Sequence, residues 1–309
     1  MTGQPPPTAA VRWPAAMRIA VLATIGQGRW WLLALATFLV RGGLLLVVVP
    51  LLILPSPADL ASLVPPSVSG TGLAQPTPTL VAILIVTGLV TFGLVVVTTV
   101  LGTWLEAALV DATAADEEVE ALAQSHGVGR VPLEAALEVR LTAHLPTAVA
   151  LGFGVFAFAD ALTSELVSPS PGSPLLVQVL QRAPLAAAVI VVAWLAGEAW
   201  GGLALRRLAT TTSTRGALRA GLGDLIRPGG LATLVLTTVV VALPLVALWL
   251  AAGRAFDRLW PLLVEPADDG IVLLALGLLV GTWFAGLWLL GIALAWRSAA
   301  WTAEVRRHT

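Results

Sequence analysis

The chain has 309 residues, of which 58% are hydrophobic and 11% charged, and its mean hydropathy is +0.92. Soluble domains carry about a quarter charged residues, so the solvent for most of this chain must be lipid. The net charge of −1 gives no basic footprint for nucleic acid, and the lack of Cys excludes disulfides, thiolate nucleophiles and Cys-ligated metal centres.

The apolar residues gather in stretches long enough to cross a bilayer core, which takes about 20 helical residues. An isolated strand would leave backbone groups unsatisfied in lipid, so each stretch is expected to be a helix. The sequence therefore predicts an all-α polytopic membrane protein with six transmembrane helices, at roughly 31–54, 80–105, 145–167, 184–205, 231–251 and 271–296.

The first of these stretches contains an unusual segment, FLVRGGLLLV, which places Arg41, Gly42 and Gly43 inside the apolar run. The run begins near Trp30 and has the length of a span, whereas a cleaved signal peptide has a shorter apolar region. We expect a retained helix with a charge near the middle of the membrane.

The distribution of Arg predicts the orientation of the helices, because basic residues favour cytoplasmic loops. The N-terminal segment, the second and fourth connections and the C-terminal segment hold most of the Arg residues, whereas the other connections hold Arg182, Arg254 and Arg258. Both termini are therefore predicted to be cytoplasmic, in the cytoplasmic membrane of a bacterium or archaeon.

The second connection is also acidic. The second span is predicted to continue as a helix over 111–124, and the segment HGVG from His126 is expected to end it. Its acidic residues are interpreted as a solvated face, and the alternative is a docking site for a basic partner. They are Asp116, Glu117, Glu118 and Glu120.

Three segments of the single membrane domain 1–309 resemble one another, at about 17–126, 127–214 and 215–309. Each begins with a short amphipathic stretch that is expected to lie at the membrane interface, and continues as a helical hairpin. The returning spans carry Trp104, Trp200 and Trp288 at matching positions. These features predict three pseudo-repeated hairpins, an arrangement that is common among multi-pass proteins.

The lead-in segments EAALEVRLTAHLP and ALRAGLGDLIRPGG carry a resemblance to a known family. With the repeated order of amphipathic helix, span, loop and span, the chain resembles bacterial and archaeal multi-pass domains related to the membrane domain of glycerophosphodiester phosphodiesterases. The resemblance implies a membrane anchor, because in that family the chemistry lies in a separate soluble domain. It carries no catalytic residues over to this chain.

Ionisable residues inside the spans are the candidate functional residues, since charges are costly in lipid and usually face a partner or a water-filled cavity. They are Arg41, Asp160 and Glu198. A structural ion pair that fixes helix packing is the alternative. Glu106 lies nearer a span end and is expected to reach the interface. Two GxxxG pairs are candidate helix-packing sites: Gly197 with Gly201, and Gly277 with Gly281.

Depth along the helices suggests a partner for Arg41. Arg41 lies 11 residues after Trp30, about 16 Å from the membrane edge, and Glu198 lies 8 residues before Arg206, about 12 Å from the same edge. An unpaired mid-span Arg costs about 2.5–3.5 kcal/mol, so a carboxylate is expected. The sequence predicts that Glu198 holds Arg41, with Asp160 as a second partner.

Catalytic motifs for nucleotide, hydrolase or metalloprotease chemistry are missing from the sequence, and His126, His144 and His308 lie far apart along it. No cofactor and no metal are therefore predicted. The leading hypothesis is a non-enzymatic scaffold, anchor or accessory subunit whose partners are the bilayer and either other membrane proteins or further copies of the chain. The alternative is a transporter or permease subunit for a small solute or lipid, using Arg41, Asp160 and Glu198. A lipid-modifying enzyme is the third hypothesis.

Overall fold

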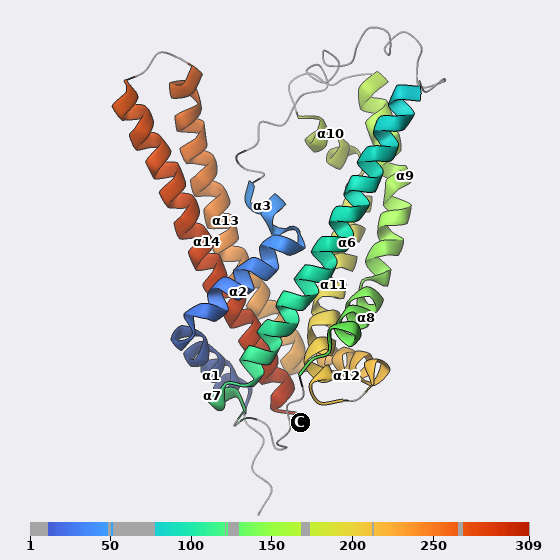
Figure 1. Cartoon of the computed structure of the whole chain (residues 1–309), viewed down its shortest axis with the longest axis vertical. Helices are drawn as coiled ribbons and strands as arrows, with labels where there is room; N and C mark the ends of the chain where they lie inside the picture. Colours follow the sequence, from blue (N-terminus) through green and yellow to red (C-terminus); the bar gives the residue numbers. More distant parts are fainter. Residues whose placement is uncertain are drawn as a thin grey trace, which may run out of the picture. The chain divides into compact units, whose positions relative to one another are not determined.

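The computed structural model describes residues 12–48, 51, 78–120, 122, 130–167, 174–211, 213–264 and 268–308. The described residues contain helices and no strand, and six of the helices are long and apolar enough to cross a membrane (Figure 1). This confirms the predicted all-α, multi-pass class. The connection at 55–79 and His126 lie outside the described residues, apart from the first residues of α6.

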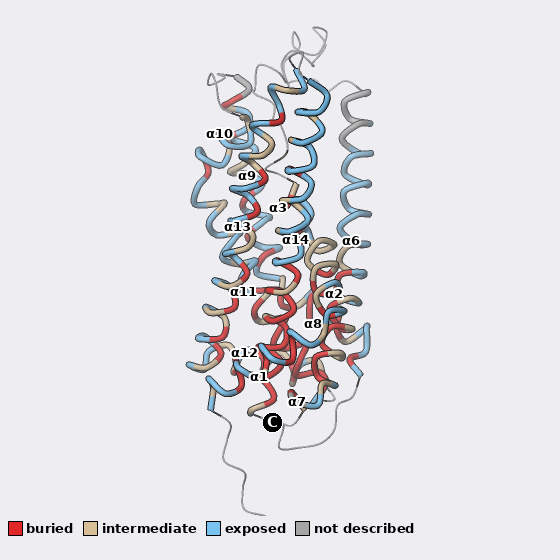
Figure 2. The backbone as a smooth tube through the Cα atoms, turned by 90° about the vertical axis from the view of Figure 1, so that its left-hand side faces the viewer, coloured by how far each residue is buried: buried red, intermediate tan, exposed pale blue. Residues whose placement is uncertain are grey.

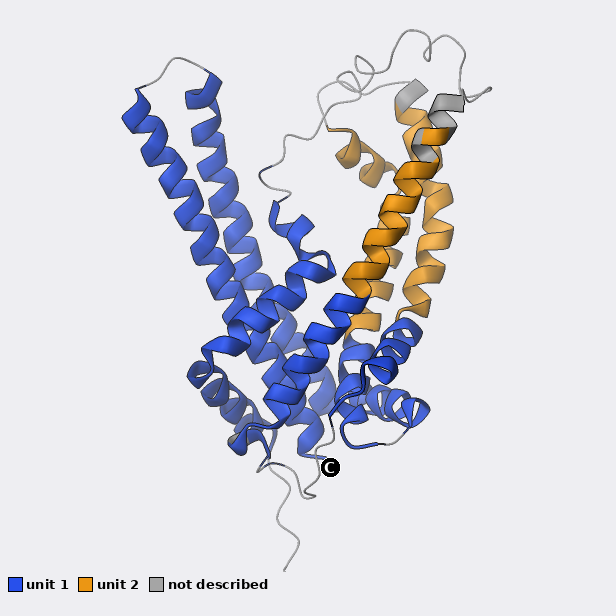
Figure 3. Cartoon of the chain, in the orientation of Figure 1, with its two compact units in different colours: residues 1–51, 100–143, 199–309 blue, residues 52–99, 144–198 orange. Residues whose placement is uncertain are grey.

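The chain divides into two compact units, drawn in different colours in Figure 3. Unit 1 comprises residues 1–51, 100–143 and 199–309. Unit 2 comprises residues 52–99 and 144–198. The boundary falls inside two long helices, α6 (Pro78–Ala114) and α11 (Pro184–Leu208), which each contribute one end to either unit.

The N-terminal part of unit 1 contains α1 (Trp13–Gly26), α2 (Gly28–Phe38) and α3 (Leu44–Val48), with a π-helical segment, η1 (Leu39–Gly43), between the last two. The predicted first span is therefore interrupted. The structure corrects the expectation of one continuous helix over 31–54.

The rest of unit 1 contains two short helices, α8 (Leu133–Ala143) and α12 (Thr214–Ile226), and two long ones, α13 (Pro228–Val264) and α14 (Asp269–Arg306). At 1.5 Å per residue, α13 and α14 each extend about 55 Å, well beyond the roughly 30 Å of a bilayer core. The sequence had placed residues 253–264 in a connection and 297–306 in a tail, but both segments continue these helices.

Most of the buried residues of unit 1 lie where the short helices meet the ends of the long ones (Figure 2). The C-terminal part of α14 is almost fully buried there, with Trp301, Thr302 and Glu304 each at most 4% exposed. Small residues permit this close packing: a Cβ added at Gly221 of α12 would lie 2.6 Å from the backbone nitrogen of Ala204.

The short helices each bury one charged residue, Arg140 in α8 and Asp224 in α12, and expose some of their large apolar ones. In α12, Asp224 is buried while Leu222 and Ile226 are 46% and 69% exposed, and in α8 Leu141 is 61% exposed. Part of each predicted apolar face thus points away from the protein core, as expected for helices at a lipid interface, whereas Ala136 of α8 and Leu218 and Leu225 of α12 pack against the core.

Unit 2 contains α9 (Leu145–Val167), the short helix α10 (Leu175–Arg182) and the first part of α11. Helix α10 packs against α9, and the sequence did not predict it.

The acidic segment after the second span, which belongs to unit 1, also differs from its prediction. Helix α6 ends at Ala114, and Asp116 begins a separate turn of helix, α7 (Glu117–Glu120), so no continuous helix covers 111–124.

Candidate functional site

The interruption of the first span places Arg41 at a break in the backbone. Arg41 (φ −82°, ψ 22°) and Gly42 (φ 99°, ψ −6°) both leave the helical conformation. Gly42 adopts the left-handed region, which only glycine enters without strain. Gly43 is also required, because a Cβ there would lie 2.6 Å from the carbonyl oxygen of Phe38. The two glycines therefore form the break itself.

The side chain of Arg41 belongs to a buried charge cluster in unit 1. Arg41 Nη1 donates to Glu106 Oε2 on α6 at 2.8 Å, and Arg140 Nη2 on α8 donates to Glu106 Oε1. The side chains of Arg41, Glu106 and Arg140 are 20%, 10% and 3% exposed. One carboxylate thus binds two guanidinium groups and joins three elements. We call these three residues the Glu106 cluster.

Glycines on the neighbouring helices make room for the Glu106 cluster. A Cβ at Gly102, one turn before Glu106, would lie 2.5 Å from Cγ of Arg41. A Cβ at Gly201 on α11 would lie 2.9 Å from Nη1 of Arg140 and 3.1 Å from Cβ of Ala143. Gly201, predicted as a helix-packing residue, therefore lies where α8 and α11 approach closely.

Glu106 is the carboxylate that sequence analysis missed as a partner of Arg41. It was expected to reach the interface, which stays a prediction, and within the protein the residue is 8% exposed. Glu106 lies eight residues before Ala114, the end of α6, or about 12 Å, which is the same depth as was derived for Glu198. Depth alone therefore could not separate the two carboxylates. Arg41 and Glu198 belong to different units, and their pairing stays a prediction.

Glu198 has a partner within unit 2. His144, directly before α9, lies with Nε2 3.1 Å from Glu198 Oε1 on α11. The two side chains are 28% and 15% exposed, so this contact is partly shielded from solvent. The contact ties the beginning of α9 to α11.

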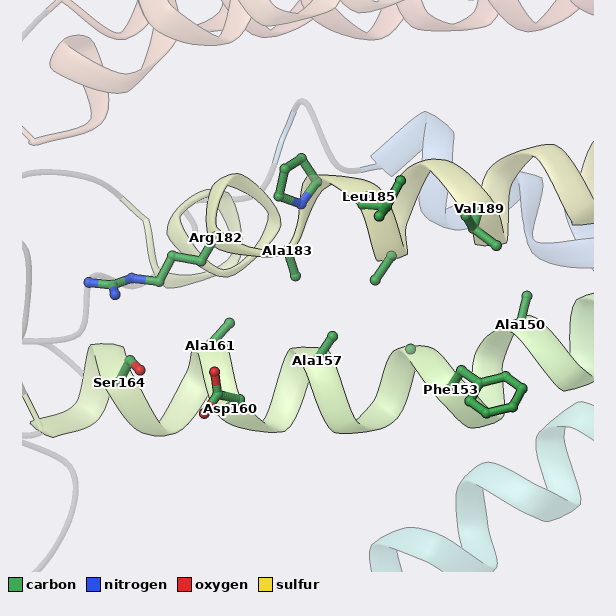
Figure 4. Close-up of a pocket in the computed structure, with 13 residues that line it drawn as sticks. Ala150, Phe153, Ala157, Asp160, Ala161, Ser164, Arg182, Ala183, Leu185 and Val189 are labelled. Carbon is green, nitrogen blue, oxygen red and sulfur yellow. The ribbon is translucent and has the colours of Figure 1, made fainter.

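Asp160 is exposed on α9. It lines a groove of about 590 Å³ between α9 and the segment where α10 meets α11 (Figure 4). Arg182 of α10 lies at the same end of the groove as Asp160 and Ser164, while Ala150, Phe153 and Val189 line the other end. The groove is thus polar at one end and apolar at the other.

The remaining predicted packing glycines behave differently from Gly201. Gly197 is buried on α11. Gly277 and Gly281 on α14 are exposed, and a Cβ at either would meet no atom within 4 Å. Helix packing at Gly277 and Gly281 therefore stays a prediction about contacts with another molecule.

Two arginines that had been assigned to a cytoplasmic connection are buried in unit 1. Arg206 is 5% exposed, and it donates to the carbonyl of Gly202 and to side-chain oxygens of Ser298 and Thr302. Arg207 forms a bidentate pair with Asp224 at 2.6 and 2.7 Å. The spacing of Ser298 and Thr302, one turn apart on an apolar helix, is the sequence signal that could have indicated a polar partner.

The described parts of the chain contain no group of three or more His, Asp or Glu side chains arranged to hold a metal ion. Several buried ionisable side chains of unit 1 pair with one another, as Arg41 and Arg140 do with Glu106 and Arg207 does with Asp224. Comparisons with protein-family models, curated proteins and solved structures find no match to this chain.

Proposed function

We propose that the chain is a non-enzymatic membrane scaffold or accessory subunit. The observation that carries this proposal is the Glu106 cluster. Its carboxylate is buried and accepts from Arg41 and Arg140, so the charge in the first span serves to join η1, α6 and α8. A buried pair of this kind fixes one arrangement of helices, which is what a platform for other proteins needs.

The outer surfaces of the spans support the same proposal. Large apolar side chains are exposed along α6, α9, α13 and α14, among them Phe92, Phe153 and Phe284, at 67%, 76% and 61%. Lipid or other membrane helices are the only favourable neighbours for such surfaces. The predicted placement in a cytoplasmic membrane, with both termini in the cytoplasm, belongs to this proposal, as does the resemblance to phosphodiesterase membrane domains.

Purification from native membranes tests the proposal. Extraction in a mild detergent should recover the chain together with a second membrane protein in fixed stoichiometry, as measured by native mass spectrometry. The exposed surface of α12, which carries Arg215 and Arg219, should cross-link to the cytoplasmic side of the complex. Recovery of the chain alone, or only with copies of itself, would contradict the accessory role.

A transporter or permease subunit is the second candidate, and the interrupted first span favours it. Transporters commonly bind their substrates at breaks in membrane helices, where backbone groups and helix ends are released. Arg41 at the break would select an anionic solute. This function requires water to reach the Glu106 cluster, so a water-soluble thiol reagent should react with a cysteine placed beside Glu106. A scaffold requires no such access.

A further inference from the structure

The groove of unit 2 has the dimensions of one leaflet of a bilayer. Its lining on α9 runs from Ala150 to Ser164, which is about 21 Å at 1.5 Å per residue. Half of a bilayer, including its headgroup region, measures about 20–22 Å. A molecule that fills the groove from end to end therefore has the length of a lipid that extends from the headgroup region to the midplane.

The walls of the groove change character along this length. Beside Phe153, the floor on α9 is made of small residues, Ala150, Gly154, Ala157 and Ala161, opposite Leu185 and Val189 of α11 (Figure 4). The helices pack tightly at Gly154, where a Cβ would lie 2.6 Å from Cδ1 of Ile190. This part offers a narrow apolar slot of the kind that an acyl chain fills.

The polar end of the groove lies near the end of α9 and the end of α10, where the membrane surface is expected. Arg182 donates through Nε to the buried carboxylate of Glu165, and the Arg182 side chain is 44% exposed. Among the described residues, no partner is seen for its two terminal nitrogens or for the carboxylate of Asp160. The end of the groove therefore presents N–H donors and one carboxylate to an incoming headgroup.

The charges at this end select among headgroups. Arg182 and Glu165 neutralise each other, and Asp160 leaves a net charge of −1, which disfavours an anionic lipid. A headgroup that carries a phosphate and an ammonium matches the two protein side chains. The phosphate binds the terminal nitrogens of Arg182, and the ammonium binds the carboxylate of Asp160. A primary ammonium also donates hydrogen bonds to the carboxylate, which a trimethylated one cannot do.

We propose that the α9–α11 groove binds one phospholipid with a primary-amine headgroup, phosphatidylethanolamine being the probe of this class. The acyl chain lies between Ala157 and Val189, and the headgroup lies between Asp160 and Arg182. This site is independent of the scaffold role, because it lies within unit 2 and uses none of the Glu106 cluster.

Cysteine protection tests the site without disturbing the fold, since the natural chain contains no Cys. The full-length Ala157→Cys variant places a thiol in the groove, and Ala159→Cys places one on the exposed face of the same helix. In detergent, added phosphatidylethanolamine should slow alkylation at position 157 at least about threefold and leave position 159 unchanged. Equal rates with and without the lipid at position 157 would overturn the proposal.

Headgroup selection is tested by native mass spectrometry with phosphatidylethanolamine, phosphatidylcholine and phosphatidylglycerol. The wild-type chain should retain the ethanolamine lipid preferentially, and Asp160→Asn should reduce that preference by about threefold to fivefold, the value of a partly exposed ion pair. Asp269→Asn, an exposed carboxylate on α14, is the matched control and should change nothing. Equal retention of the three lipids by the wild type would overturn the headgroup assignment.

Discussion

At the scale of single residues, the charge in the first span is compensated by a buried carboxylate on another helix. Glu106 holds Arg41 and Arg140 simultaneously, so the three residues are not equivalent. Removal of Arg41 leaves Glu106 with Arg140, whereas removal of the Glu106 charge takes away the carboxylate that both guanidinium groups share. Buried ion pairs lose most when one partner is left uncompensated.

Glu106→Gln is therefore expected to lower the free energy of unfolding by about 3–5 kcal/mol, and Arg41→Met by less. The double variant should show a coupling of about 1–3 kcal/mol between the two positions. Reversible unfolding in mixed micelles measures these values. Glu138→Gln, an exposed carboxylate that bonds Thr214, is the control and should change stability by under about 0.5 kcal/mol. Strictly additive losses at Arg41 and Glu106 would contradict the pairing.

Two glycines should respond oppositely to the same substitution. Gly42→Ala forces a side chain into the left-handed region and should cost about 1–2 kcal/mol. Gly277→Ala lies in a regular helix facing open space and should stabilise α14 by about 0.5–1 kcal/mol. Thermal unfolding in one detergent compares the two variants directly. A Gly42→Ala protein as stable as the wild type would show that the break is not fixed by Gly42.

At the scale of helices, short interfacial elements are fixed to the spans by buried charges. Asp224 of α12 is 2% exposed and accepts two hydrogen bonds from Arg207 of α11 and one, at 2.9 Å, from Arg227. Leu218 and Leu225 are the partly buried leucines of α12 that pack against the core, while Leu222 and Ile226 point outward. The ion pair should therefore decide whether α12 stays docked.

Asp224→Asn should release α12 and expose its backbone to protease. Arg215 and Arg219 already have exposed side chains, so trypsin cleavage at these residues is limited by the helical backbone. Loss of about 2–3 kcal/mol of docking would raise the cleavage rate by roughly 30-fold to 150-fold. Limited proteolysis with mass spectrometry identifies the sites. Unchanged cleavage at Arg215 and Arg219 would show that α12 is held by other contacts.

The sequence predicted the helical elements better than their ends and their contacts. Hydrophobic length located the six long helices, because lipid permits few other structures. The predicted ends were wrong where helices are longer than the bilayer core is thick, as for the helices that end at Val264 and Arg306. Polar residues beyond the bilayer core resemble loop residues in the sequence. The break at Gly42 was missed because adjacent glycines are tolerated in membrane helices.

Contacts between distant residues were harder to predict than the helices. Glu106 and Glu198 lie at the same depth by residue count, so depth does not decide which carboxylate contacts Arg41. The rotation of each helix about its own axis decides this contact, and the sequence does not give that rotation. Arg206 looked like a positive charge in a loop, although it is buried against Ser298 and Thr302. The groove around Asp160 depends on how α10 meets α11, and α10 itself had no predicted boundary.

At the scale of the whole molecule, the even number of candidate spans predicts that both termini lie on one side of the membrane. The Arg distribution predicts that this side is the cytoplasm. Reporter fusions at Thr309 and within 67–76 should therefore report opposite sides, with the cytoplasmic signal at Thr309. A periplasm-active reporter at Thr309 would contradict this topology, and the same fusion with a cytoplasmic reporter is its control.

The central claim of the scaffold account is that the Glu106 cluster is sealed from water, and thiol accessibility at Thr103 tests it most directly. Thr103 lies one turn before Glu106 on α6 and is 3% exposed, and the chain has no other Cys to react. Arg219→Cys on the exposed surface of α12 is the positive control. In open membrane fragments, Thr103→Cys should react with a membrane-impermeant thiol reagent at least about 100-fold more slowly than Arg219→Cys, because a dry thiol stays protonated. Comparable rates at the two positions would show a water path to Arg41 and would favour transport over a scaffold.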